Sequence, residues 1–217
     1  MNRVLFVAPH PDDEVLGCGG TMKKLSEAGC EVHLCVVTKA YTPEWTEETI
    51  KNKVEEIKTS SAILGVEKIH SLGLPTVKLD TLPQKDLNGA LAEVIKDSQP
   101  DTVYIPHRGD INKDHTLVHE ATLVACRPSA HCPVKRILAY ETLSETEWGN
   151  VPFWPTVYEE ISDTLGAKIE AMRVYESELK QFPHPRSKEG MEVLARKRGS
   201  EVYTTAAEAF ILIREQR

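Results

Sequence analysis

His10, Asp12 and Asp13 form the most chemically informative cluster of this sequence, because they directly follow the apolar run 4–8. Such a run predicts a buried strand that carries the three side chains to its carboxyl end, where open α/β sheets bind ligands. One imidazole and one carboxylate there suit a divalent metal ion, and the second carboxylate is left for proton transfer. The cluster therefore predicts a hydrolytic metal site.

A second polar cluster, residues 106–115, follows another apolar run at 102–105 and precedes a helical pattern. If the two strands are parallel, both clusters emerge at the same edge of the sheet. His115 would then complete a set of two histidines and one carboxylate with His10 and Asp13. Three protein ligands and an open position are typical of catalytic zinc. The same ligands also suit Fe(II), so a non-haem iron oxygenase is a rival interpretation.

Helix capping is the simpler interpretation of several of these residues taken singly. Four residues of preferred N-cap types stand just before predicted helices: Asp12, Asp13, Asn112 and Asp114. A lone histidine such as His115 is also more often structural than a ligand. Two such clusters, each after a buried strand, favour a metal site. A rival interpretation makes both His115 and His119, one helical turn apart, metal ligands as in the zincin motif H-E-x-x-H. Thr116 stands in place of the glutamate of that motif and cannot act as a base.

The elements that must position these clusters alternate along residues 3–140. Five β-rich runs predict strands at Arg3–Ala8, Glu31–Thr38, Lys68–Leu72, Thr102–Ile105 and Arg136–Tyr140. Amphipathic patterns between them predict helices at Leu16–Ala28, Glu47–Leu64, Gln84–Asp97 and Thr116–Ala125. Such alternation is typical of a parallel sheet covered on both faces. We therefore expect an α/β fold, a Rossmann-like three-layer sandwich with a mostly parallel sheet and the metal site at the C-terminal edge of its strands.

Residues 142–217 are less regular, and we expect them to belong to the same domain, 1–217, and to contribute to the substrate pocket. Aromatic, glycine and proline residues predict a loop or short strand at Trp148–Pro155. Later patterns predict helices at Ile161–Glu178 and Glu189–Arg198, and either a closing strand or the end of the core at Glu208–Ile213.

The composition is that of a globular protein, with 41% hydrophobic and 27% charged residues. The net charge of −7 argues against nucleic acid or an anionic membrane as the main partner. No segment approaches the roughly 20 apolar residues of a membrane span. None of the five cysteines belongs to a C-x-x-C pair, which favours buried thiols in a reducing compartment. We therefore expect a cytoplasmic protein.

Ala8–Glu14, followed by Leu16-Gly17 and Gly19-Gly20, resembles the signature of the PIG-L / LmbE-like N-deacetylases. Asp114-His115 is similar to the second motif of that family, and Glu56–Gly65 is similar to one of its helices. The resemblance covers most of residues 3–125. It implies hydrolysis of an N-acetyl group on a glucosamine-containing conjugate, with release of acetate. The resemblance also implies assembly into homo-oligomers.

By this resemblance His10, Asp13 and His115 bind Zn²⁺, although Fe²⁺ or Co²⁺ suits the same ligands. Asp12 is then the general base, and Asp114 orients a neighbouring imidazole. Zinc lowers the pKa of a bound water to around 7, which lets a nearby carboxylate take its proton.

Asn112 departs from the family pattern, because many members carry a histidine three residues before the last ligand. An amide can donate a hydrogen bond to an oxyanion but cannot supply a proton near neutral pH. The candidates for the general acid are Asp12 after it has taken the proton of water, which ranks first, then His184 and His107. Asn112 also favours a second interpretation, a non-catalytic sugar-binding protein that keeps the pocket.

Further residues could contact the substrate: Asn112, His107, Arg108, Lys53 and Arg186. Arg108 and Arg186 could bind a phosphate or carboxylate. Lys53 stands where the family often has a substrate-contacting arginine, but a solvated charge is an equal interpretation. Trp148 and Trp154 could stack on a sugar ring, although core packing is the simpler expectation.

The glycine-rich run 17–20 lacks the G-x-G-x-x-G spacing directly after a strand, so it does not indicate a dinucleotide site. We expect these glycines to allow close approach of the backbone to the substrate or to the loop that carries His10 and Asp12.

Overall fold

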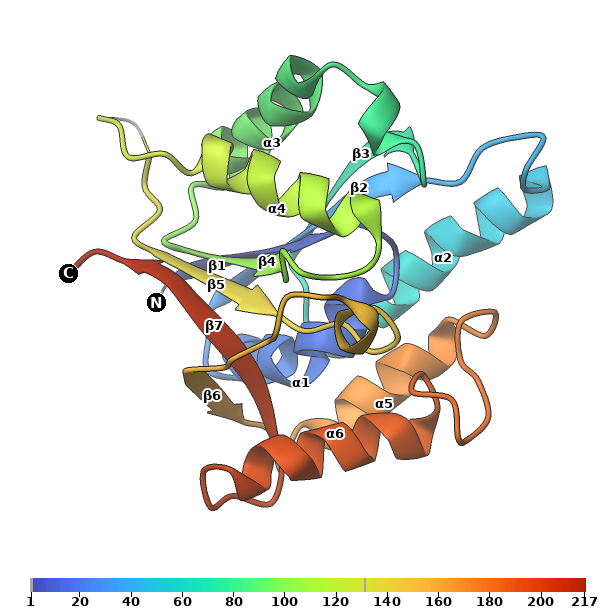
Figure 1. Ribbon diagram of the computed structural model, residues 1–217, viewed down its shortest axis with the longest axis vertical. Helices are drawn as coiled ribbons and strands as arrows, with labels where there is room; N and C mark the ends of the chain where they lie inside the picture. The colour runs from blue at the N-terminus through green and yellow to red at the C-terminus, as the bar shows by residue number, and fades with distance from the viewer. Residues whose placement is uncertain (1, 131) are drawn as a thin grey trace.

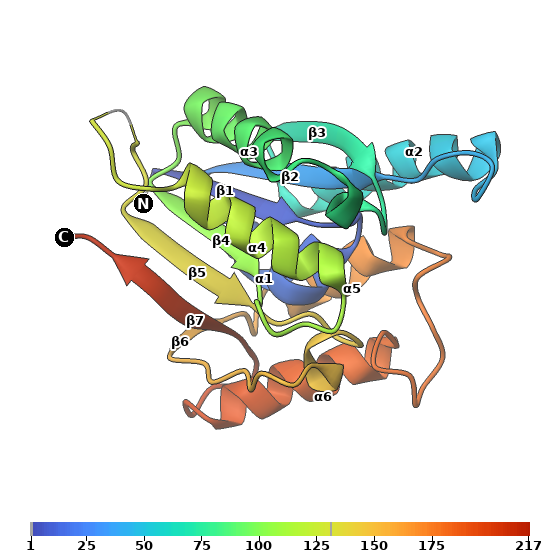
Figure 2. The same ribbon diagram turned by 45° about the horizontal axis from the view of Figure 1, so that its top comes forward.

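The computed structural model describes residues 2–130 and 132–217 of the chain. Within them runs a seven-stranded sheet in the order β3-β2-β1-β4-β5-β7-β6. The strands are β1 Arg3–Ala8, β2 Glu31–Lys39, β3 Lys68–Pro75, β4 Thr102–Pro106, β5 Arg136–Tyr140, β6 Val157–Glu160 and β7 Ala207–Glu215. Strands β1 to β5 are parallel, whereas β7 pairs antiparallel with β5 and β6, as the opposed arrows of β5 and β7 show in Figure 2. The predicted mostly parallel sheet is confirmed.

Helices cover both faces of this sheet, which gives the three layers visible in Figure 1. One face carries α1 Asp13–Glu27, α2 Glu47–Leu64, α5 Leu165–Val174 and α6 Lys188–Ser200. The other face carries α3 Gln84–Ser98 and α4 Lys113–Ala125. Two single-turn 3₁₀ helices, η1 Leu79–Thr81 and η2 Thr146–Trp148, lie in connecting loops. The expected α/β sandwich is confirmed.

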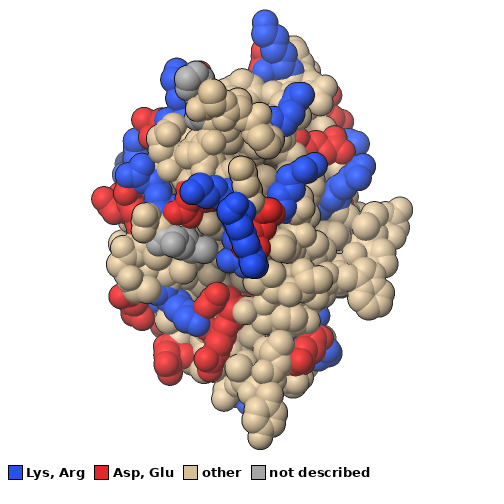
Figure 3. All heavy atoms as spheres, turned by 90° about the vertical axis from the view of Figure 1, so that its left-hand side faces the viewer, with Lys and Arg blue, Asp and Glu red and all other residues tan. Residues whose placement is uncertain are grey.

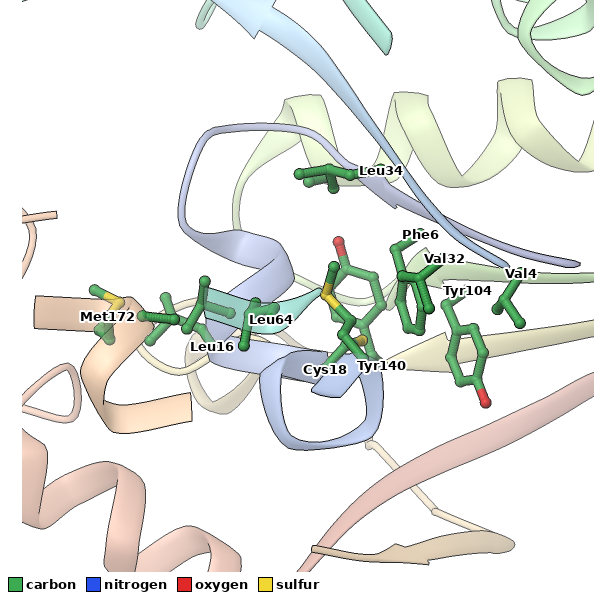
Figure 4. Close-up of a cluster of buried hydrophobic side chains, with 14 of the residues drawn as sticks. Val4, Phe6, Leu16, Cys18, Val32, Leu34, Leu64, Tyr104, Tyr140 and Met172 are labelled. Carbon is green, nitrogen blue, oxygen red and sulfur yellow. The ribbon is translucent and has the colours of Figure 1, made fainter. Parts of the chain in front are cut away.

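The central strands are buried because their side chains are apolar on both faces. Figure 4 shows Val4 and Phe6 of β1 beside Tyr104 of β4, with Cys18 of α1 in the same buried cluster. The Phe6 and Tyr104 rings stack with their centroids 4.5 Å apart. Phe6 and Tyr104 are also register partners in the parallel β1–β4 ladder. The chain therefore leaves β1 and β4 at the same edge of the sheet.

Residues 142–217 are more ordered than their sequence suggests. Their β6, an edge strand of four residues, lies where we expected no strand, and β7 carries it onto the main sheet. The helix expected at Ile161–Glu178 is shorter at both ends, because α5 spans only Leu165–Val174. Tyr175 leaves the helical conformation directly after α5, and its hydroxyl donates a hydrogen bond to Glu14 at 2.7 Å. This buried contact favours an end to the helix at this point.

Helix α1, which begins at the metal-ligand candidates, is held closely against the sheet. A Cβ atom on Gly17 would lie 2.3 Å from the Tyr140 ring, so only glycine permits this approach. The close approach predicted for the glycine run is therefore made to Tyr140 of β5 at Gly17 and to Ile161 at Gly20, rather than to the loop that carries His10 and Asp12. Glu208 of β7 accepts hydrogen bonds from two backbone N–H groups of α1 and from Lys168 at 2.6 Å. These contacts fix the helix that carries the site.

On the face shown in Figure 3, acidic and basic side chains are interspersed and neither sign covers the surface continuously. Among the residues that the structure describes, no helix is both long and apolar enough to cross a membrane.

Candidate metal centre and active site

Two histidines and a carboxylate meet at the carboxyl edge of the sheet. His10 follows β1, Asp13 begins α1, and His115 lies in the first turn of α4. One possible ligand atom of each of these residues lies within 4.8 Å of the other two. Asp13 Oδ2 is 3.2 Å from His10 Nδ1 and 3.2 Å from His115 Nε2. The sequence clusters thus converge on one group of potential metal ligands.

A second carboxylate lies behind each imidazole. Asp114 Oδ2 is 3.1 Å from His10 Nε2, and Asp110 Oδ2 is 2.8 Å from His115 Nδ1. Asp114 also accepts the backbone N–H of Val77 at 2.7 Å. Metal-ligating histidines commonly use such contacts to fix the orientation of the ring. The arrangement directs His10 Nδ1 and His115 Nε2 toward the shared Asp13 carboxylate.

Two atoms of this cluster lack hydrogen bonds. Within the described part of the chain, Asp13 Oδ1 and His115 Nε2 are buried and have no hydrogen-bond partner. His115 Nε2 is near Asp13 Oδ2, but the contact does not have hydrogen-bond geometry. Leaving such atoms unsatisfied is costly, and a cation bound between them would satisfy both. The donor set therefore fits a divalent metal.

The charges of the cluster are strongly coupled. Burial disfavours the charged form of His10, but Asp114 and Asp13 outweigh it and raise the pKa of His10 to about 9. Burial acts in the same way on His115, whose pKa is raised to about 10 by Asp13 and Asp110. Although burial opposes it, the two histidines hold the pKa of Asp13 below its ordinary value. The carboxylates thus create a site that attracts positive charge.

Asp12 occupies the N-cap position of α1 without capping the helix. Its φ of 111° is uncommon for a residue with a side chain, and its carboxylate makes no cap hydrogen bond. Instead, Asp12 Oδ2 accepts a hydrogen bond from Arg186 Nη1 at 3.0 Å. Burial and the Asp13 charge raise the pKa of Asp12 well above its ordinary value, and Arg186 opposes this shift. A raised pKa suits a general base that works near neutral pH.

Arg186, expected to bind substrate, is already engaged by the protein. Besides Asp12, it donates to Ser144 Oγ at 2.6 Å and to Glu145 Oε1 at 3.1 Å. His184 Nδ1 accepts the backbone N–H of Arg186 at 3.1 Å. The segment after α5 therefore reaches back and places a guanidinium group against Asp12.

Glu14 forms buried hydrogen bonds that support the loop around Asp12. Its carboxylate accepts the backbone N–H of Asp12 at 3.0 Å and the Tyr175 hydroxyl at 2.7 Å. Burial raises the pKa of Glu14 to about 7, even though the Tyr175 hydrogen bond acts against the shift. Glu14 thus helps to hold the loop in which Asp12 stands.

A pocket of about 240 Å³ opens beside these residues. Three of the residues expected to contact the substrate line it, namely Lys53, Asn112 and Arg186. The Asn112 side chain caps α4 by accepting the Asp114 N–H at 3.1 Å, which confirms the capping interpretation for this residue. Lys53 forms an ion pair with Glu56 at 2.7 Å, so it is not simply a solvated charge. Residues 142–217 contribute to the pocket through Arg186 and two glutamates, Glu145 and Glu178.

Other candidates lie outside this pocket. Arg108 is exposed and 3.7 Å from Glu120, and buried His107 contacts the Val151 carbonyl at 3.1 Å. His184 is exposed and touches the site only through Arg186. The structure does not bring these three side chains to the predicted substrate position.

The remaining candidates, Trp148, Trp154 and His119, also lie outside this pocket. Trp148 and Trp154 are 71% and 74% exposed, so core packing was the wrong expectation, and neither lines the pocket. His119 Nδ1 lies 2.9 Å from the Pro106 carbonyl and does not belong to the ligand cluster.

Sequence reasoning missed Asp110, Glu145, Glu178 and Tyr175. Asp110 lies within the second polar cluster, five residues before His115, and that position was the available signal. Tyr175 and Glu178 fall within the predicted helix Ile161–Glu178, and Glu145 in an irregular segment, so nothing in the sequence links them to the site. Only the path of the chain brings these three residues there.

Comparison with known proteins shows the family of the chain. The family profile described as GlcNAc-PI de-N-acetylase, PIG-L, matches residues 5–126. The chain is 30% identical over 180 residues to the uncharacterized deacetylase YaiS of Escherichia coli, covering 80% of this chain and 90% of that protein. It is 30% identical over 199 residues to the diacetylchitobiose deacetylase of Thermococcus kodakarensis, covering 84% of this chain and 71% of the relative.

A solved structure has the same fold. The conserved protein TT1542 from Thermus thermophilus superposes with a TM-score of 0.82 at 26% identity, over 100% of this chain and 97% of that one. The family profile covers the strands, loops and helix starts that carry the metal-ligand candidates. The chain belongs to the PIG-L family of GlcNAc-PI de-N-acetylases and their relatives.

Proposed function

We propose that this protein is a zinc-dependent N-deacetylase that removes the acetyl group from an N-acetylglucosamine-type conjugate. The observation that carries the proposal is the His10–Asp13–His115 cluster, with Asp13 and His115 buried, beside a carboxylate, Asp12, that is not needed as a ligand. Deacetylases of such sugars among the relatives support the choice of reaction. The cysteine spacing of the sequence, without a C-x-x-C pair, favours a reducing compartment such as the cytoplasm.

His10, Asp13 and His115 would hold the metal ion, and Asp110 and Asp114 would orient the two imidazoles. When bound, the ion would supply Lewis-acid chemistry that activates water and polarises the acyl carbonyl. Asp12 would take the proton of the attacking water, because its carboxylate lines the pocket beside Asp13. Arg186 would keep one oxygen of that carboxylate in place.

Asn112 lines the pocket with its side-chain oxygen engaged by the N–H of Asp114. This leaves the amide NH₂ group as a hydrogen-bond donor for the acyl oxygen as charge develops on it. The leaving amine still requires a proton. Asp12 is the preferred source, since His184 and His107 lie outside the pocket. One carboxylate would thus act first as base and then as acid.

An Asp12→Asn variant separates this enzyme from a binding protein that merely keeps the pocket. Loss of a positioned general base typically lowers the rate about 10²–10⁴-fold. We expect the variant to bind one zinc ion like the wild type and to release amine from N-acetylglucosamine conjugates at that reduced rate. Equal turnover by the two proteins would contradict the role of Asp12.

A further inference from the structure

The candidate active-site pocket has two chemically different halves. One half is polar and contains His10, Asp12 and Asp13 together with Asn112 and Arg186. The other half is apolar, and its side chains come from two separate segments: Trp45, Ile50, Val54, Ile57 and Val77. The proposed reaction involves only side chains of the polar half. The apolar half therefore needs its own explanation.

Three of these side chains form a stripe along α2. Ile50, Val54 and Ile57 are spaced four and three residues apart, which places them on one face of the helix. Val54 remains 38% exposed. Trp45, just before the helix, extends the stripe, and its ring packs edge-on against Tyr41 with centroids 5.5 Å apart. Lys53 of the same helix also lines the pocket, but its charge is held in ion pairs with Glu56 and Glu178. The stripe beside it is an apolar surface that the protein itself does not cover completely.

Val77 contributes apolar surface from the segment after β3. It is 67% exposed, and its φ of 57° lies in the left-handed region. That conformation is strained for a β-branched residue, and such strain is concentrated at functional sites. The backbone N–H of Val77 donates to Asp114, the carboxylate behind His10. The contact that orients the metal-ligand candidate also fixes an exposed valine at the pocket.

We propose that this apolar half is a subsite for an apolar substituent on the sugar, on the amine side of the scissile amide. The assignment rests on the proposed function, because an acetyl group is too small to occupy the apolar surface as well as the reaction site. A sugar presents hydroxyl groups that suit the polar half. The surface formed by α2 and Val77 then remains for an alkyl or aryl aglycone, whose burial releases water from both surfaces.

The direct test is a series of N-acetyl-β-glucosaminides with methyl, butyl, hexyl and phenyl aglycones. Each methylene that becomes buried should raise kcat/KM about threefold to fourfold. We expect the butyl glycoside to exceed the methyl glycoside at least about tenfold. Equal values across the series would overturn the subsite and indicate that the apolar surface packs only against the sugar ring. A preference for longer N-acyl chains on the methyl glycoside would overturn its assignment to the amine side.

Two substitutions test whether the preference for longer aglycones depends on the apolar half of the pocket. Val77→Gly removes the side chain from a position that glycine adopts readily, so the fold should be retained. Val54→Ser makes an exposed position polar. In each variant the butyl-to-methyl ratio of kcat/KM should fall at least about threefold. Val193→Ser is the matched control, because Val193 is 61% exposed on α6 and lines a different cavity. An equal fall of this ratio in the Val193→Ser protein would show that the preference does not depend on the apolar half of the pocket.

Binding to the Asp12→Asn protein distinguishes failure of the subsite from failure of the proposed reaction. Calorimetry should show that the butyl glycoside binds at least about tenfold more tightly than the methyl glycoside. If no glycoside is turned over by the wild type but this ratio persists, the proposed reaction fails and the subsite stands. Equal affinities would overturn the subsite whatever the activity.

Discussion

Replacement of Arg186 by alanine would remove the cation that holds Asp12. The Arg186 and Asp12 side chains are only 15% and 4% exposed, and Nη1 lies 3.0 Å from Asp12 Oδ2. The same guanidinium group pairs with Glu145 at 3.1 Å. Its loss leaves two partly or fully buried carboxylates without their positive partner.

The size of the effect follows from this burial. Removal of one partner of a buried ion pair typically costs 3–5 kcal/mol, and the pocket position of this pair places the expected loss at about 3 kcal/mol. For a chain of this size that loss corresponds to a fall in Tm of about 6–12 °C. Turnover should fall about 100-fold through kcat, because the base loses its orientation.

The pH profile gives an independent readout. Arg186 opposes the rise in the pKa of Asp12, so its removal should raise that pKa further. Asp12 would then be protonated up to a higher pH, and the acidic limb of the kcat profile should move to higher pH. Arg186→Lys should show a smaller change, because the charge remains while the planar fork is lost.

Arg198→Ala is the matched control. Arg198 is also 15% exposed and binds both oxygens of Glu141, at 2.8 and 2.7 Å, but it does not line the active-site pocket. The control should lower Tm comparably and leave kcat and its pH profile unchanged. The reasoning would be refuted if Arg186→Ala kept full kcat with an unshifted profile, or if Arg198→Ala shifted the profile equally.

Further predictions concern the metal centre and its support. Asp110→Asn should weaken zinc binding about 10- to 100-fold in a competition titration, since the carboxylate orients His115; unchanged affinity would exclude that role. Chelation of the metal should lower Tm in a thermal melt, because zinc at about 1,000 times its Kd contributes about 4 kcal/mol to the native state; an unaltered melt would show that no metal is held. Tyr175→Phe should cost about 1–3 kcal/mol in denaturant unfolding, because buried Glu14 loses a donor; a variant as stable as the wild type would mean that this hydrogen bond is dispensable.

The parallel part of the fold could be predicted because its strands are apolar on both faces. Strands such as β1 and β5 have the boundaries expected from the sequence, Arg3–Ala8 and Arg136–Tyr140. The edge strand β6, Val157–Glu160, contains two glutamates and is only partly buried, so it lacks that signal. Its strand character comes from pairing with β7, which local sequence does not encode.

The candidate ligands could be identified because each stands directly after a strand or at the start of the helix that follows. Arg186 could be named as a candidate, but its contact with Asp12 could not be predicted, because the two residues lie 174 positions apart in the sequence. Val77 carried no sequence signal, because valine gives no indication of a left-handed backbone. Such features depend on chain segments that meet only in the folded protein.

The most direct test of the central claim is acetate and amine release from a panel of N-acetylglucosamine conjugates. Zinc-loaded wild type would be compared with metal-stripped protein and with stripped protein to which zinc is returned. The account predicts equal amounts of acetate and amine from the loaded protein, loss of release on stripping and its return with zinc. Release that persists in the stripped protein, or no release of either product by protein that holds one zinc ion, would contradict it.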